Sequence, residues 1–147
     1  MTLAERLNED LKLAMKSQDK FKLSVLRMVC AAIKNQEIER KRALDDSEVI
    51  DVLSREIKQR RDSLQDFEKA GRTDLAEQAS AEIEIISAYL PKPLTDEEVT
   101  ALVQQTIQET GASSKADMGK VMAALMPKVK GRADGKLVNQ IVSQHLS

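Results

Sequence analysis

The residues best suited to chemistry lie in a short basic segment near the C-terminus. Four cations and two glycines fall within nine residues there: Lys128, Lys130, Gly131, Arg132, Gly135 and Lys136. Glycine lets the backbone approach a partner closely, and a helix that follows such a turn presents free amide groups at its N-terminus. Phosphate groups bind at such sites, so the segment is a candidate phosphate-binding turn. The alternative is a solvated tight turn in which Asp134 caps the next helix, and the residue types leave both interpretations open.

A second group of basic residues lies near the middle of the chain and consists of Lys58, Arg60 and Arg61. Glu56 stands four residues before Arg60, and opposite charges at this spacing attract one another on a helix surface without any ligand. Residues 40–42 form a third basic group, since each is Lys or Arg. Lys58, Arg60 and Arg61 are therefore a secondary candidate patch, with structural pairing as the open alternative.

Other kinds of site lack the residues that they need. The single Cys and single His cannot build a structural zinc site, which needs about four such ligands, or an internal disulfide. No P-loop, dinucleotide-binding or hydrolase motif is present. The three aromatic residues, Phe21, Phe67 and Tyr89, are too few for a module that stacks bases on exposed rings. The residues therefore predict a binding protein with no catalytic residues, no metal and no cofactor.

The spacing of apolar residues predicts the helices that must position these groups. Leu3, Leu7, Leu11 and Met15 are spaced four apart, which places them on one face of a helix. Further amphipathic stretches are expected over about residues 19–42, 45–71, 73–89, 95–111, 114–127 and 135–146. Capping boxes, in which two residues bond each other's backbone amides, are expected at Thr2 with Glu5 and at Thr95 with Glu98.

Two prolines divide this helical pattern. Pro91 and Pro93 cannot continue a helix, so they mark a boundary. We expect an all-α fold: a helical N-terminal domain of about four helices in residues 1–90, a proline-containing linker in residues 91–95, and a small three-helix C-terminal domain in residues 96–147. Gly119, inside the second of the short helices, indicates a close contact between helices.

Charge and hydropathy predict the compartment. The chain has 23 basic and 24 acidic residues, so the basic turn is hidden in a balanced total. The longest apolar run, Met28–Ile33, is far shorter than the roughly 20 residues that cross a bilayer. No targeting segment is visible, and one Cys fits a reducing environment. The expectation is a cytoplasmic protein without a membrane partner.

Several fragments gain meaning when they are taken together in chain order. They are Leu26-Arg27, Ala32-Ile33-Lys34 with Glu37, Ile57–Ser63 with Phe67, Ala70–Arg72, Asp74–Ala76, Tyr89–Pro91, Asp117–Met122 and Gly131–Gly135. The set resembles the YqeY-like proteins of the GatB/YqeY family from nearly end to end. One departure lies ahead of Glu82, where the family usually has Lys and Glu and this chain has Gln78 and Ala79.

The resemblance implies a function. The family is similar to the C-terminal helical and tail region of the B subunit of the tRNA-dependent amidotransferase, which forms Gln-tRNA or Asn-tRNA with glutamine as nitrogen donor. The chain resembles that tail without the catalytic region. It is therefore expected to be a non-catalytic tRNA-binding or amidotransferase accessory factor, with tRNA, an amidotransferase or an aminoacyl-tRNA synthetase as partner. The alternatives are a helical protein-interaction adaptor and a family-inherited carbon–nitrogen ligase activity with glutamine as amido donor.

Overall fold

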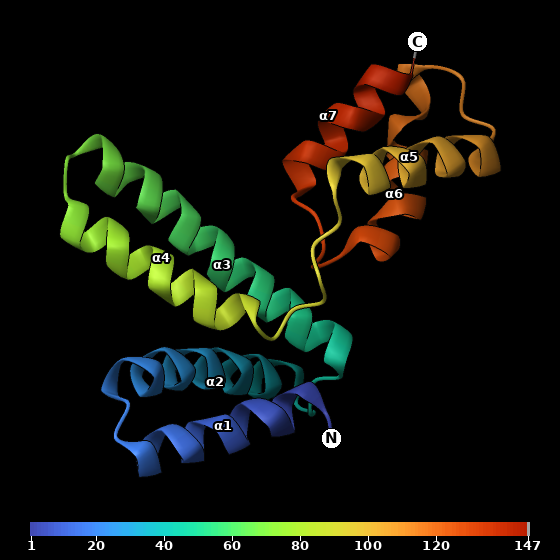
Figure 1. The fold of residues 1–147 in the computed structure, drawn as a ribbon. Helices are drawn as coiled ribbons and strands as arrows, with labels where there is room; N and C mark the ends of the chain where they lie inside the picture. The colour runs from blue at the N-terminus through green and yellow to red at the C-terminus, as the bar shows by residue number, and fades with distance from the viewer. Residues whose placement is uncertain (147) are drawn as a thin grey trace. The chain divides into compact units, whose positions relative to one another are not determined.

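The computed structural model describes residues 1–146, and within that range the chain forms seven α-helices, one short 3₁₀ helix and no strand (Figure 1). The predicted all-α class is confirmed. The chain divides into two compact units, Met1–Leu90 and Pro91–Ser147, which we call unit 1 and unit 2. Each unit has its own cluster of buried apolar side chains.

Unit 1 consists of two helical hairpins packed on each other. Its helices are α1 (Leu3–Ser17), α2 (Lys20–Arg40), α3 (Asp46–Lys69) and α4 (Thr73–Ser87). Neighbours in sequence pair with each other, α1 with α2 and α3 with α4, and α2 also packs against both helices of the second hairpin. This arrangement leaves one side of α2 and the outer side of α1 in contact with solvent.

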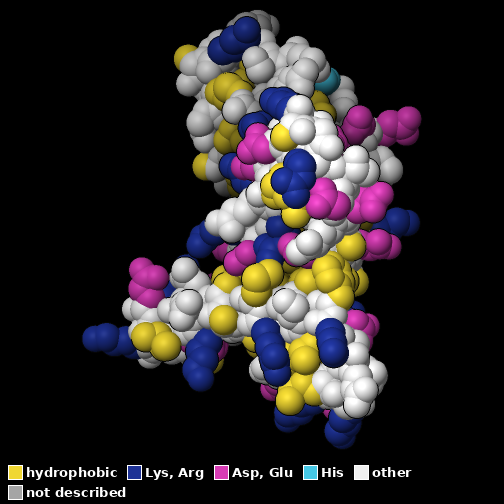
Figure 2. All heavy atoms as spheres, turned by 90° about the vertical axis from the view of Figure 1, so that its left-hand side faces the viewer, with side chains coloured by type: hydrophobic (Ala, Val, Ile, Leu, Met, Phe, Trp, Pro, Cys, Tyr) yellow, Lys and Arg dark blue, Asp and Glu magenta, His cyan; other side chains and the backbone are white. Residues whose placement is uncertain are grey.

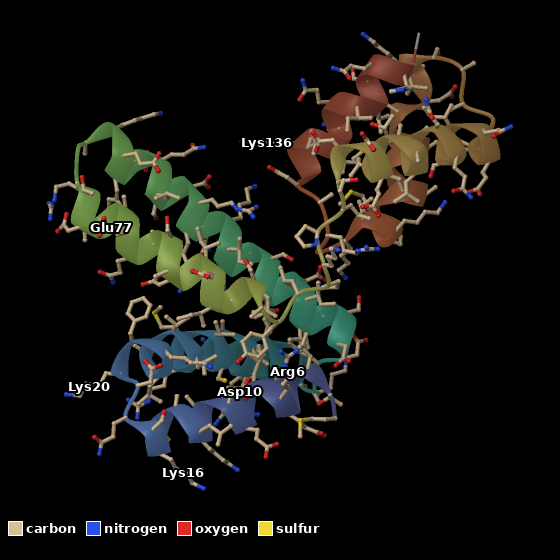
Figure 3. All side chains as sticks on the ribbon, viewed as in Figure 1. Arg6, Asp10, Lys16, Lys20, Glu77 and Lys136 are labelled. Atoms are coloured by element: carbon tan, nitrogen blue, oxygen red, sulfur yellow. The ribbon has the colours of Figure 1, made fainter. Side chains whose placement is uncertain are left out.

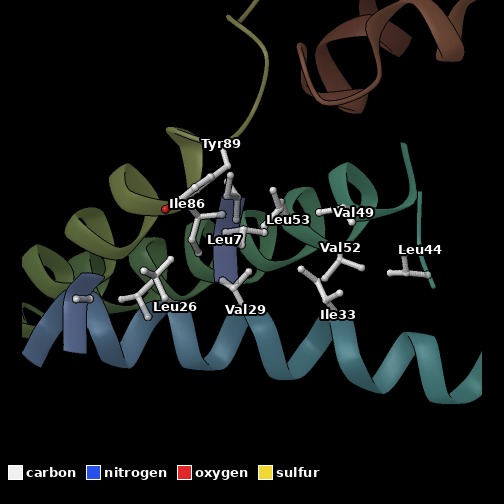
Figure 4. Packing of buried hydrophobic residues seen from close by; sticks show 13 residues of the cluster. Leu7, Leu26, Val29, Ile33, Leu44, Val49, Val52, Leu53, Ile86 and Tyr89 are labelled. Carbon is white, nitrogen blue, oxygen red and sulfur yellow. The ribbon is translucent and has the colours of Figure 1, made fainter. Parts of the chain in front are cut away.

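The core of unit 1 draws on every helix. Leu7, Leu26, Leu53 and Ile86 come from α1, α2, α3 and α4, and each is 1% exposed or less (Figure 4). Full burial of one such side chain contributes roughly 1.5–3 kcal/mol relative to leaving it in water. The apolar side chains at the spacing seen in the sequence therefore pack the two hairpins together.

Local side-chain contacts set where the helices begin. The capping boxes predicted at Thr2 with Glu5 and at Thr95 with Glu98 are both formed. A third joins Asp45 and Glu48 at the start of α3. Each satisfies backbone amides that have no partner inside the helix.

Unit 2 is a three-helix arrangement with a short 3₁₀ turn. Its elements are α5 (Asp96–Thr110), η1 (Lys115–Asp117), α6 (Met118–Val129) and α7 (Gly135–His145). Val103, Val121, Leu125, Val138 and Val142 are completely buried among these helices.

Two details of α6 differ from the expectation. The helix continues past Pro127 to Val129. The proline removes only one intrahelical hydrogen bond, and the next turn still closes because Lys130 N donates to Met126 O at 2.9 Å. The close helix contact expected at Gly119 is wrong: a Cβ built there meets no atom within 4 Å.

Candidate nucleic-acid interface

The predicted phosphate-binding turn is a short loop between α6 and α7. Gly131 has φ +72°, in the left-handed region that glycine adopts without strain. Gly135 is the first residue of α7 and is exposed. The Asp134 carboxylate accepts a hydrogen bond from Lys136 N at 3.1 Å, so it caps α7 and places a negative charge where a phosphate would bind.

Arg132 is engaged within unit 2. Its Nε donates to the carbonyl oxygen of Lys92 at 3.0 Å, and its own carbonyl accepts from Leu94 N at 2.8 Å. These two bonds fasten the proline-containing segment to the loop. The donor edge of the guanidinium that carries Nε is therefore occupied by backbone.

The other cations of the turn differ in their surroundings. Lys128 belongs to α6, and its ammonium group donates to Glu109 Oε2 at 3.1 Å and to Thr106 Oγ1 at 3.3 Å. The hydrogen bond from Lys128 lowers the pKa of Glu109, so the carboxylate is ionised and its negative charge offsets the positive charge of Lys128. Lys130 is half-buried and interacts within the chain, whereas Lys136 is exposed at the start of α7 (Figure 3). The fold therefore places residues 130–136 together at the loop, whereas the side chain of Lys128 points to α5.

The secondary basic patch separates into inward and outward residues. Arg60 is 11% exposed and forms ion pairs with Glu56 at 2.7 Å and with Glu82 of α4 at 2.8 Å. Gln78, at the departure from the family pattern, donates to the other oxygen of Glu82 at 3.3 Å. Lys58 and Arg61 are exposed. Arg60 therefore joins α3 to α4 and does not face a ligand.

The two arginines of the third basic group share one carboxylate. Arg40 forms an ion pair with Glu48, and Arg42 makes two parallel hydrogen bonds to the same carboxylate at 2.7 and 2.8 Å. The hydrogen bond from Arg42, then that from Asp45 N, lowers the pKa of Glu48 from 4.5 to about 2. These arginines fix the loop that leads into α3.

Sequence reasoning missed the largest group of cations without an ion pair in the described chain. It lies on α1 and α2 and consists of Lys12, Lys16, Lys20, Lys22, Arg27 and Lys34. We call these six residues the cationic surface. Asp19 is the single acidic residue between Lys12 and Lys34, so the local charge balance along the sequence was the signal that could have revealed it.

The cationic surface has a regular geometry on α2. Lys20, Arg27 and Lys34 are seven residues apart, which places them on one side of the helix at intervals of about 10 Å. Lys16 and Lys20 lie at the same end of the α1–α2 hairpin, and both point away from it (Figure 3). Figure 2 shows Lys and Arg side chains mixed with hydrophobic ones over the part of unit 1 that α1 and α2 form.

The far end of the α3–α4 hairpin has the opposite charge. Residues 61–84 contain seven acidic and three basic residues. A shallow groove there is lined by Glu68, Glu77 and Glu84 among small side chains. The two hairpins of unit 1 therefore differ in charge, and a polyanion is attracted to α1 and α2 and repelled by the far end of α3 and α4.

A buried tyrosine near the C-terminal end of unit 1 is hydrogen-bonded to α1. Tyr89 is 6% exposed, and its hydroxyl donates to Asp10 Oδ2 at 2.5 Å. The Arg6 guanidinium lies 4.8 Å from the centre of the tyrosine ring (Figure 3 labels Arg6 and Asp10). Burial raises the pKa of Tyr89, and the Asp10 carboxylate raises it further, so the phenol stays protonated. This contact is structural.

The remaining candidate groups fit structural roles. Cys30 is half-buried, and burial raises the pKa of its thiol. His145 Nδ1 lies 2.9 Å from the carbonyl oxygen of Ile141 in its own helix. Among residues 1–146, no three His, Cys, Asp or Glu side chains are grouped to hold a metal ion. No helix in that range has the length and apolarity needed to cross a membrane.

Comparison with known proteins finds relatives in fungi. A protein of Pyrenophora tritici-repentis is 30% identical over 142 residues, which cover 95% of this chain and 78% of the relative. One of Kluyveromyces lactis is 34% identical over 94% of this chain and 79% of the relative. One of Lachancea thermotolerans is 38% identical over 74% of this chain and 59% of the relative.

All three relatives have the same name, "Altered inheritance of mitochondria protein 41, mitochondrial". The cytoplasmic location predicted from the sequence is contradicted by this name. The single Cys that supported that prediction does not distinguish one reducing compartment from another.

The family model described as "Yqey-like protein" matches residues 4–146, which include both units. The match agrees with the fragments from Leu26 to Gly135 on which the resemblance rested. This chain belongs to the YqeY-like protein family.

Proposed function

We propose that this protein is a non-catalytic RNA-binding protein that takes tRNA through contacts with backbone phosphates. The observation that supports it best is the cationic surface: six Lys and Arg side chains on one hairpin without an ion pair to a described residue. Several cations of the other basic groups form ion pairs or hydrogen bonds within the fold, namely Arg40, Arg42, Arg60, Lys128 and Arg132. The choice of tRNA rests on the family resemblance.

The binding mechanism is electrostatic. Each phosphate that a Lys or Arg neutralises releases condensed counterions, so affinity falls steeply as salt rises. The acidic end of the α3–α4 hairpin limits the orientations in which a polyanion can approach unit 1. In unit 2 we propose a smaller contribution from Lys136 and Lys130, with the backbone of Gly131 and Gly135 close to the RNA.

The test is binding of total tRNA to the full chain between about 50 and 200 mM salt, with mitochondrial tRNA included because of the relatives' name. The triple variant Lys20→Gln, Arg27→Gln, Lys34→Gln should reduce the slope of log affinity against log salt by about 2 to 3 units. Its matched control, Lys58→Gln, Arg61→Gln, Lys69→Gln, makes the same change of net charge on α3 and should leave the slope nearly unchanged.

Two results would overturn the proposal. The absence of tRNA binding at low salt would refute the RNA-binding function, and equal losses in the two triple variants would refute the assignment to α1 and α2. The ligase alternative has its own assay, in which the purified chain receives misacylated tRNA and glutamine. We expect no amide product, and measurable turnover would contradict the non-catalytic proposal.

One observation favours the adaptor as a second candidate function. Leu13, Met15 and Ile38 are 56%, 52% and 66% exposed on α1 and α2, and exposed apolar side chains occur at protein-binding surfaces. Such an adaptor would bind an amidotransferase or an aminoacyl-tRNA synthetase. A direct complex with either purified enzyme that persists at high salt and without RNA would support it, and a complex lost under those conditions would not.

A further inference from the structure

An exposed aromatic ring lies within the cationic surface. Phe21 stands between Lys20 and Lys22 in the first turn of α2 and is 40% exposed. The other two aromatic residues are placed differently: Tyr89 is buried, and Phe67 is half-buried near the acidic end of α3. The small number of aromatic residues argued against base stacking, but the fold positions one of them beside Lys20 in the cationic surface.

The surroundings of Phe21 suit a stacking surface. Met28, seven residues further on, is 44% exposed and lies on the same side of α2, about 10 Å along the helix. Lys20 precedes Phe21 by one residue and Arg27 precedes Met28 by one residue, so the two cations lie about 100° around the helix from the two apolar side chains. Val25, one turn beyond Phe21, is 1% exposed, so the ring lies at the margin of the core.

We propose that Phe21 stacks on an unpaired base of the bound RNA while the neighbouring cations contact its phosphates. This inference rests on the proposed RNA-binding function and defines the part of the RNA that is recognised. Bases inside a duplex are stacked on one another and offer no free face, whereas loops and single-stranded ends do. The surface therefore prefers unpaired RNA to a continuous duplex.

The chain contains no Trp, so Phe21→Trp introduces a single fluorescent reporter at the proposed contact. Titration with a single-stranded RNA oligonucleotide should quench its fluorescence, and a duplex with the same number of phosphates should quench it far less. Phe67→Trp is the matched control, because it makes the same substitution among acidic residues of α3, and we expect no quenching there.

Affinity measurements supply an independent test. Phe21→Leu should lower the affinity for single-stranded RNA roughly 10-fold, with little change for duplex RNA or in the salt slope. Phe21→Tyr keeps a stacking ring and should restore the affinity. Circular dichroism of each variant identifies any loss of fold, and the tyrosine variant keeps the test decisive if leucine disturbs the helix.

The outcomes separate the two proposals. Salt-dependent RNA binding with no quenching of the F21W reporter, or equal quenching by duplex RNA, overturns the stacking contact and leaves the proposed function intact. Absence of RNA binding by the unmodified chain overturns the proposed function itself. Quenching or a blue shift of F21W by vesicles of anionic lipid, with no response to RNA, assigns the surface to a bilayer and refutes the inference.

Discussion

Several cations that the sequence offers as ligand-binding candidates form ion pairs within the fold. Arg60 follows Glu56 by four residues, which predicts a weak exposed pair, yet the structure adds Glu82 from another helix and leaves the arginine 11% exposed. Glu48 similarly accepts from Arg42 and pairs with Arg40, so two of the three cations at residues 40–42 are engaged within the fold. At the residue scale, a cation's distant neighbours decide whether it can meet a ligand.

Arg60→Leu should destabilise unit 1 by about 2 kcal/mol, because two half-buried carboxylates lose their partner. Urea denaturation of the full chain measures this loss. The adjacent exposed residue provides the control: Arg61→Leu should change the free energy of unfolding by no more than about 0.5 kcal/mol. Equal effects of the two substitutions would show that the ion pairs across α3 and α4 are energetically unimportant.

The Glu48 carboxylate predicts a pH dependence. Folding lowers its pKa from 4.5 to about 2, so the stabilisation is complete above pH 4.5 and is lost as the pH falls towards 2. Glu48→Gln should therefore lower the free energy of unfolding above pH 4.5, and its difference from the unmodified chain should shrink towards pH 2. Denaturation curves at several pH values test this. Arg42→Gln should remove most of the same pH dependence, and a constant difference across the range would contradict the assignment.

At the scale of elements, helix ends and helix interiors make opposite demands on glycine. Gly111 follows α5 with φ +70°, a left-handed conformation that side chains with a Cβ disfavour. Gly119 is the second residue of α6 and has a negative φ. A Cβ at either position would meet no atom within 4 Å, so packing does not complicate the comparison.

Gly111→Ala should therefore lower the stability of unit 2 by about 1 kcal/mol, because only the backbone conformation opposes the methyl group. Gly119→Ala should raise it by about 0.5–1 kcal/mol, because alanine loses less backbone entropy than glycine when a helix forms. Thermal denaturation of both variants gives the two signs. Destabilisation by Gly119→Ala would mean that the helix has a neighbour at that position after all.

At the scale of the whole molecule, the two units have separate apolar cores. The core of unit 1 ends at Tyr89, and that of unit 2 begins at Val99. Pro91 and Pro93 lie between them. Because a domain folds around its own buried side chains, we predict that residues 1–90 fold without the remainder of the chain.

The fragment of residues 1–90 should show helical circular dichroism and a cooperative thermal transition. The fragment of residues 91–147 has the smaller core and should melt at a lower temperature, since short domains bury a smaller fraction of their surface. Cooperative unfolding of the full chain together with unfolded isolated fragments would contradict this independence.

Much of the fold follows from local physics and could be predicted. The capping boxes at Thr2 and Thr95 depend on residues three positions apart, and the helical stripes depend on spacings of three or four. The error at Pro127 arose because a proline near the end of a helix costs a single bond. The candidate site was harder to predict, because exposure and pairing are not local properties.

The sequence by itself determined the helical elements, the capped starts of α1 and α5, and the family, since each depends on neighbouring residues or on order along the chain. Only the tertiary structure decided which cations are bound to partners within the protein. Arg60 meets Glu82 across 22 residues, Lys128 meets Glu109 across 19, and Arg132 meets the backbone of Lys92 across 40. It also decided that Phe21 is exposed beside Lys20. The physical reason is that charge neutralisation and burial depend on distances in space, which helix packing sets and local spacing does not.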